Sequence, residues 1–92
     1  QTIQMLKTLC QVPGVSGGEE KALEAAEQLC EGLGRCSRTV HKSLICQVME
    51  QEKGRPHLVL NAHIDEIGLT VTHIEEEGFL RVASAEALTA VW

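Results

Sequence analysis

The interval between apolar residues changes once along this chain, near Cys36, and that change constrains the fold more than any other feature. Before Cys36 the apolar residues recur every three or four positions, as on one face of a helix. After Cys36 they alternate with polar residues over several short runs, as in strands. Helices followed by strands within 92 residues predict a single α/β unit.

Two helices are expected before this change. Residues 2–12 carry an apolar stripe, and "PGVSGG" (13–18) ends that segment because proline and glycine do not continue a helix. Ser16 and Glu19 then have the spacing of a capping box, in which the serine hydroxyl accepts the Glu19 N–H and the Glu19 side chain returns to Ser16. The second helix is predicted to run to about Leu33.

The strands are expected as short segments separated by turns. Residues 57–62, "HLVLNA", form a continuous apolar run that is typical of a strand buried on both faces of a sheet. Residues 67–74 and 79–83 flank "EEEG", which predicts a hairpin with Gly78 at its tight turn. Two earlier strands are predicted at residues 38–40 and 43–51.

Composition argues against several classes of function. The chain has one Phe, one Trp and no Tyr, so it lacks aromatic platforms for single-stranded nucleic acid. Its net charge of -5 opposes the basic surface that nucleic acid requires. No apolar run approaches the roughly 20 residues that cross a membrane. The four cysteines form no CxxC pair, and Cys10 and Cys30 fall on the apolar faces of the predicted helices, so buried free thiols in a reducing cytosol are expected.

The candidate site lies in "NAHIDEIG" (61–68), just after the apolar run. Open α/β sheets bind ligands beyond the carboxyl ends of their strands, and His63 and Asp65 occupy that position. Two residues apart on an extended segment, their side chains point to the same side. His63 could then bind a metal while Asp65 holds its other ring nitrogen. On spacing alone a capped strand end is favoured, because His-x-Asp is common by chance.

Three longer stretches resemble a known family of enzymes. "LCQVPGVSGGEE", "HLVLNAHIDEIGLTVTHI" and "EEEGFLRV" look like the start of the co-catalytic zinc aminopeptidases of peptidase clan MH. That family includes glutamyl and deblocking aminopeptidases, and some members are named endoglucanases. The resemblance runs from about Leu6 to Val82. It implies that residues 1–84 are the N-terminal part of an α/β/α catalytic domain, with two helices followed by strands of a mixed sheet.

The resemblance also implies roles for the two site residues. His63 would bind one of two zinc or cobalt ions, and Asp65 would be a catalytic acid that orients the site. The implied reaction is hydrolysis of N-terminal residues from peptides, in which a metal-bound water attacks the carbonyl. The family's other ligands and its general base fall beyond this sequence, so at most one partial metal site is expected here.

The last residues depart from the family pattern. After "GFLRV" the family continues through a glycine pair, whereas this chain reads "ASAEALTAVW". Residues 85–92 are therefore expected to be a divergent or frameshifted tail, because one coding string for them gives a family-like Gly-Gly-Val-Asp-Arg in another reading frame. At residues 41–43, His-Lys-Ser also replaces the family's usual Gly-Asn turn.

Two hypotheses from different classes follow. The first is a cytoplasmic, metal-dependent aminopeptidase, of which this chain is a truncated and inactive portion. The second is a non-enzymatic α/β fragment that associates with itself through exposed sheet edges, without metal. A glycan hydrolase is disfavoured, because Asp65 and Glu66 are adjacent and would point to opposite faces of a strand.

Overall fold

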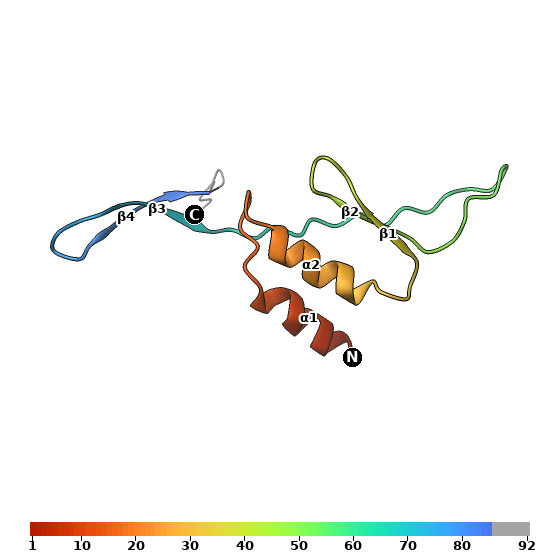
Figure 1. The fold of residues 1–92 in the computed structure, drawn as a ribbon, viewed down its shortest axis with the longest axis horizontal. Coiled ribbons are helices and arrows are strands. Elements are labelled where there is room, and N and C mark those ends of the chain that lie inside the picture. The colour runs from red at the N-terminus through yellow and green to blue at the C-terminus, as the bar shows by residue number, and fades with distance from the viewer. Residues whose placement is uncertain (86–92) are drawn as a thin grey trace, which may run out of the picture.

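Two helices open the chain, close to where the sequence predicts them. The computed structural model describes residues 1–85. Helix α1 spans Thr2–Gln11 and helix α2 spans Glu20–Leu29, so α2 ends before the predicted Leu33. The two helices lie against each other, and Figure 1 shows them side by side. Only α2 has buried residues, and much of the predicted apolar face of α1 stays open, since Ile3 and Leu6 are 70% and 56% exposed.

The start of α2 differs from the predicted capping box. The N-cap residue is Glu19, and no side chain caps the helix. The Ser16 hydroxyl instead donates to Asp65 Oδ2 at 2.6 Å, and Glu19 Oε1 accepts the Gly17 N–H at 2.8 Å. The capping-box prediction is wrong because a carboxylate distant in sequence takes the serine hydroxyl in a stronger, charge-assisted hydrogen bond.

Four strands form two separate antiparallel pairs. The strands are β1 (Arg35–Arg38), β2 (Leu44–Gln47), β3 (Leu69–Ile74) and β4 (Leu80–Ser84). Strand β1 pairs with β2, and β3 pairs with β4. A parallel bridge also joins Val15 to Glu66. Helices followed by strands confirm the α/β class.

The two hairpins turn in different ways. In β3–β4, Gly78 has φ 91° and its N–H donates to Glu75 O at 2.9 Å, which confirms the predicted tight position. In β1–β2, the Thr39 N–H donates to Ser43 O at 2.9 Å, and Lys42 has φ 61°. A left-handed backbone is unfavourable for lysine, which has a Cβ atom, and this segment is where the resembling family has its Gly-Asn turn.

Residues 57–62 do not form the predicted buried strand. They have no regular secondary structure, and Leu58, Val59 and Leu60 are 87%, 80% and 89% exposed. A strand buried on both faces needs hydrogen-bonded neighbours and covering layers, and residues 1–85 supply neither to this segment. Figure 1 shows it as an extended trace that runs past the β1–β2 hairpin.

The buried core of the described residues is small. Its buried hydrophobic members are Ala22, Leu23 and Ala25 of α2. The molecule measures 63 × 30 × 26 Å with a radius of gyration of 17.9 Å, whereas a compact domain of this length would have about 12 Å. These dimensions are consistent with an incomplete domain, as the family resemblance implies.

Residues 86–92, which make up all but the first residue of the predicted tail, lie outside the described residues. Within residues 1–85, no helix has the length and apolar character to cross a membrane.

Candidate functional site

Two segments that are far apart in the sequence meet at the His63 motif. The Glu66 N–H donates to Gly14 O at 2.8 Å, and the Gly14 N–H donates to Glu66 Oε1 at 3.3 Å. These contacts accompany the parallel bridge between Val15 and Glu66. The structure therefore brings together "PGVSG" and "HIDEIG", which are parts of two of the stretches that carry the family resemblance.

Glycines allow this close approach. A Cβ atom on Gly68 would lie 2.5 Å from Val15 Cγ2, and one on Gly14 would lie 3.3 Å from Ala22 Cβ. Real Cβ atoms do not approach a β-branched side chain as closely as 2.5 Å, so a larger residue at Gly68 would push the segments apart. Through Gly14, which is buried, the site segment also rests on α2.

Asp65 is the central residue of the site. Its Oδ1 lies 2.9 Å from His63 Nδ1, and its Oδ2 accepts the Ser16 hydroxyl at 2.6 Å. The backbone oxygen of Asp65 also lies 3.1 Å from His63 Nδ1. An ionised carboxylate only accepts hydrogen bonds, so this contact favours the tautomer with the proton on Nδ1, which leaves the Nε2 lone pair for a metal.

The two predicted residues differ in exposure. The Asp65 side chain is 33% exposed, whereas the His63 side chain is 86% exposed. Asp65 is thus held inside the junction while the imidazole extends into solvent. The predicted contact between them is present, and their roles in metal binding and catalysis stay predictions.

Ser16 is a site residue that sequence reasoning missed. Its spacing to Glu19 predicts helix capping, whereas its place in "PGVSG" is the only sequence signal that links it to the His63 motif. Serine, aspartate and histidine together also suggest a nucleophilic triad, but there the serine donates to the histidine. Here Ser16 donates to the aspartate, so Asp65 has contacts with both Ser16 and His63.

The described residues fit only part of a metal site. Zinc in proteins normally has three or four protein ligands. Within residues 1–85, no group of three or more His, Cys, Asp or Glu side chains could hold a metal ion. The other histidines, His41, His57 and His73, are exposed and lie apart in a turn, an irregular segment and β3. His63 with Asp65 therefore fits one ligand and its orienting acid.

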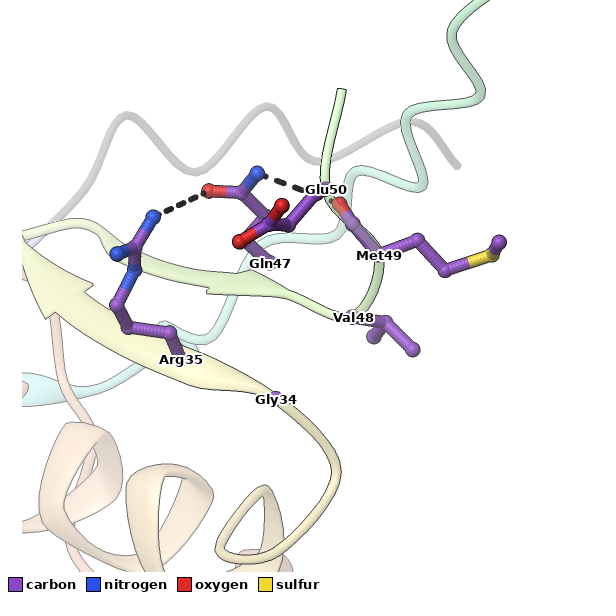
Figure 2. Close-up of a pocket in the computed structure, with 6 residues that line it drawn as sticks. All are labelled: Gly34, Arg35, Gln47, Val48, Met49 and Glu50. Carbon is purple, nitrogen blue, oxygen red and sulfur yellow. Dashed lines mark hydrogen bonds between the residues drawn. The ribbon is translucent and has the colours of Figure 1, made fainter. Parts of the chain in front are cut away.

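Away from the His63 motif, a polar hollow lies at the open end of the β1–β2 hairpin (Figure 2). Arg35 Nη2 donates to Gln47 Oε1 at 3.3 Å, and Gln47 Nε2 donates to Met49 O at 3.2 Å. Figure 2 shows these groups paired with one another, while the Val48 side chain points away from them. Arg35, Gln47 and the Met49 carbonyl thus pair with one another, and the hollow is separate from the His63 motif.

Comparisons with known proteins agree with the family that the motifs predict. The model of the M42 glutamyl aminopeptidase family matches residues 43–85, a range that includes His63 and Asp65. A protein of Acetivibrio thermocellus that is named as an aminopeptidase is 33% identical over 81 residues. The Escherichia coli protein FrvX, also named as an aminopeptidase, is 35% identical over 80 residues, and the lysyl aminopeptidase of Pyrococcus furiosus is 32% identical over 80 residues.

These matches cover most of this chain but little of the relatives. They extend over 87%, 86% and 86% of this chain, and over 24%, 22% and 22% of the three relatives. No solved structure matches the chain significantly. The matches confirm the resemblance to the M42 glutamyl aminopeptidase family, and this chain spans about a quarter of the length of these three relatives.

Proposed function

We propose that this chain supplies one part of the active site of a cytoplasmic, metal-dependent aminopeptidase that removes N-terminal residues from peptides. The single observation that carries the proposal is the contact of His63 Nδ1 with Asp65 Oδ1 at 2.9 Å. A carboxylate that holds one ring nitrogen of a histidine fixes the tautomer and makes the other nitrogen a better metal ligand.

The contacts support a proposed role for each site residue. His63 would hold one divalent ion, zinc or cobalt, through Nε2. Asp65 keeps the proton on Nδ1 and fixes the ring, and the Ser16 hydroxyl fixes Asp65 in turn. The bound ions of such a site would polarise a peptide carbonyl and activate water.

The names of the relatives support the reaction class. All three are aminopeptidases by name, and the lysyl aminopeptidase indicates a preference for one N-terminal residue in that protein. Because this chain corresponds to less than a quarter of each, we extend only the general activity to it, with a peptide as the substrate.

A self-associating fragment without enzymatic activity is the second candidate. Exposed apolar side chains in residues 58–60 favour it, as do the strand edges that have no neighbour among residues 1–85. Such edges are templates for pairing with another chain. Concentration-dependent assembly in sedimentation, unchanged by a chelator, would support this alternative over the first.

A chimera tests the proposed aminopeptidase role. The 80-residue region of the P. furiosus lysyl aminopeptidase that matches this chain is replaced by the corresponding residues of this chain. Hydrolysis of a lysyl anilide is then measured with added zinc or cobalt. We expect activity that falls at least ~100-fold in His63→Ala, since loss of a ligand removes metal from the site.

Two further variants make the result specific. Asp65→Asn should lose activity by ~10–100-fold because the amide no longer fixes the Nδ1–H tautomer. His73→Ala is the matched control, since His73 is also exposed but lies on β3 away from the site. A folded chimera that is inactive, or one that stays active in His63→Ala, would contradict the proposal.

A further inference from the structure

Three of the four cysteines gather at the β1–β2 hairpin, apart from His63 and Asp65. Cys36 lies on β1 and Cys46 on β2, directly opposite each other in the register. Cys30 is the C-cap residue of α2. These three are partly buried free thiols, whereas Cys10 of α1 is exposed, contrary to its predicted burial.

The side chains of Cys36 and Cys46 lie on the face of the hairpin that packs on α2. Side chains alternate along a strand, so Cys36 shares its face with Arg38, whose guanidinium pairs with two glutamates of α2. Arg35 and Gln47 project from the opposite face, where they bond to each other (Figure 2). The two thiols are thus held between the sheet and the helix.

The register places Cys36 and Cys46 at a non-hydrogen-bonded pair of the ladder. The Thr39 N–H donates to Ser43 O, which makes that pair hydrogen-bonded. Hydrogen-bonded and non-hydrogen-bonded pairs alternate in an antiparallel ladder, and three steps of one residue lead from Thr39 to Cys36. Opposite residues at such positions have Cα atoms about 4.5 Å apart, within the range of about 4.4–6.8 Å that a disulfide accepts.

The thiols are also in contact. A hydrogen bond with Cys46, followed by burial, raises the pKa of the Cys36 thiol to about 11. Burial is the main cause that raises the pKa of Cys30, with the charge of Cys46 next. A thiolate is the species that attacks a disulfide, so the raised pKa values slow attack by Cys36 and by Cys30 at neutral pH.

We propose that Cys36 and Cys46 are a reversible oxidation site, which closes to a cross-strand disulfide when the protein meets a low-molecular-weight disulfide such as oxidised glutathione. One cysteine thiolate attacks a sulfur of oxidised glutathione, the S–S bond breaks, and one glutathione thiolate leaves. The second cysteine thiolate then attacks the mixed disulfide and expels the other glutathione. Two protein thiols are oxidised, one glutathione disulfide is reduced to two thiols, and the protons of the cysteines pass to them through solvent.

The bond would be easily reduced again. A Cα separation near the lower limit for disulfides leaves little room for relaxed geometry, and strained disulfides are the labile, regulatory ones. Cys30 provides a third thiol in contact with the pair. It could form a disulfide with either cysteine, so the experiment must distinguish its products from the Cys36–Cys46 disulfide.

Unfolded and folded chains should give different products. Cys30 and Cys36 have the shortest separation in sequence of any cysteine pair, so loop closure favours their pairing in an unfolded chain. In the folded chain, the ladder favours Cys36 with Cys46 instead. The identity of the disulfide therefore reports whether the fold directs the reaction.

The experiment treats the full 92-residue chain with oxidised glutathione, in buffer and in concentrated urea. Remaining thiols are alkylated, and peptides are mapped by mass spectrometry without reduction. We expect a Cys36–Cys46 crosslink as the main product in buffer and a Cys30–Cys36 crosslink as the main product in urea. Dithiothreitol should restore the free thiols.

Two single variants serve as controls. Cys10→Ser and Cys30→Ser should leave the Cys36–Cys46 crosslink as the main product in buffer, with circular dichroism checking the fold. The proposal is overturned if the chain in buffer gives mainly a Cys30 crosslink, a Cys10-linked dimer, glutathione adducts that do not resolve, or unreacted thiols. It is also overturned if buffer and urea give the same product.

Discussion

The two hairpins of this molecule have similar backbone pairing but different surroundings. Strands β1 and β2 lie beside α2, and four of their eight residues are partly buried. Every residue of β3 and β4 is exposed, and Figure 1 shows this hairpin extending away from the helices. Pairing of two strands satisfies the hydrogen bonds of their backbones, but side chains are buried only where a helix or another sheet packs on the pair. The first hairpin has such a layer within residues 1–85 and the second does not.

The site segment lies at the base of the exposed hairpin. Residue Gly68, just before β3, packs on Val15, and the Ala85 N–H donates to Gly68 O at 3.1 Å. The junction between residues 13–17 and 63–68 therefore holds both the site and the base of β3–β4. We expect the site to depend on this junction more than on the rest of the hairpin.

The largest effect is expected where the packed hairpin begins. A Cβ atom on Gly34 would lie 2.2 Å from Gln47 O, a backbone atom that cannot rotate away. Gly34→Ala should therefore destabilise the fold by about 3 kcal/mol in urea unfolding. In Gly18→Ala the nearest atom is Val15 O at 3.5 Å, an ordinary contact, so this control should unfold like the parent chain.

A change at the junction should act on the site and spare the packed hairpin. Gly68→Ala should cost about 2 kcal/mol, because its new Cβ meets the stiff Val15 side chain. NMR of the imidazole nitrogens should show that His63 loses its preference for the Nδ1–H tautomer. Amide exchange in β1 and β2 should stay slow. Equal loss of protection in both hairpins would show that the molecule unfolds as one unit and would contradict the comparison.

The two turns should respond in opposite directions to changes at their left-handed residues. Lys42→Gly relieves a left-handed lysine at φ 61° and should stabilise the chain by about 1 kcal/mol. Gly78→Ala forces alanine into φ 91° and should destabilise β3–β4 by about 1 kcal/mol. Thermal unfolding of both variants measures the effects. A stability loss in Lys42→Gly would indicate that chain flexibility outweighs strain there.

Substitutions of two arginines should give smaller effects that test the packing of α2 on the β1–β2 hairpin. Arg38 pairs across elements with Glu20 and with Glu27, the latter at 2.8 Å, whereas Arg81 pairs within its own hairpin with Glu75 at 2.6 Å. Arg38→Gln should lower the urea midpoint slightly, and Arg81→Gln should lower it less, because exposed ion pairs contribute little to stability. Added salt should narrow the difference. If both variants unfold alike, the ion pairs to α2 contribute nothing to packing the first hairpin.

The sequence predicted the two helices and the β3–β4 hairpin well, but it placed the first strand at residues 38–40 instead of Arg35–Arg38 and missed the long-range contacts. Helix and hairpin positions follow from apolar spacing and turn residues, which are local, and Gly78 illustrates this. The Ser16 contact to Asp65 joins residues 49 positions apart, and no local pattern marks it. The prediction of a buried strand at residues 57–62 was wrong for the same reason. An apolar run favours a buried strand, but it does not show that a neighbouring strand is present to pair with it.

The smallest expected effect is a dependence of stability on alkaline pH, confined to the hairpin that carries cysteines. The hydrogen bond with Cys46 and burial raise the pKa of Cys36 from 9.0 to about 11, so folding favours the protonated thiol. That stabilisation is fully present below pH 9.0 and is lost as the pH rises through about 11. The midpoint of thermal unfolding should therefore fall between pH 9.0 and about 11. The midpoint of the Cys36→Ala variant should fall less over the same range. Lysines also lose charge in this range, but they do so in both proteins. An identical decline in the two would mean that the Cys36–Cys46 contact does not form in solution, which would weaken the case for their reversible oxidation as well.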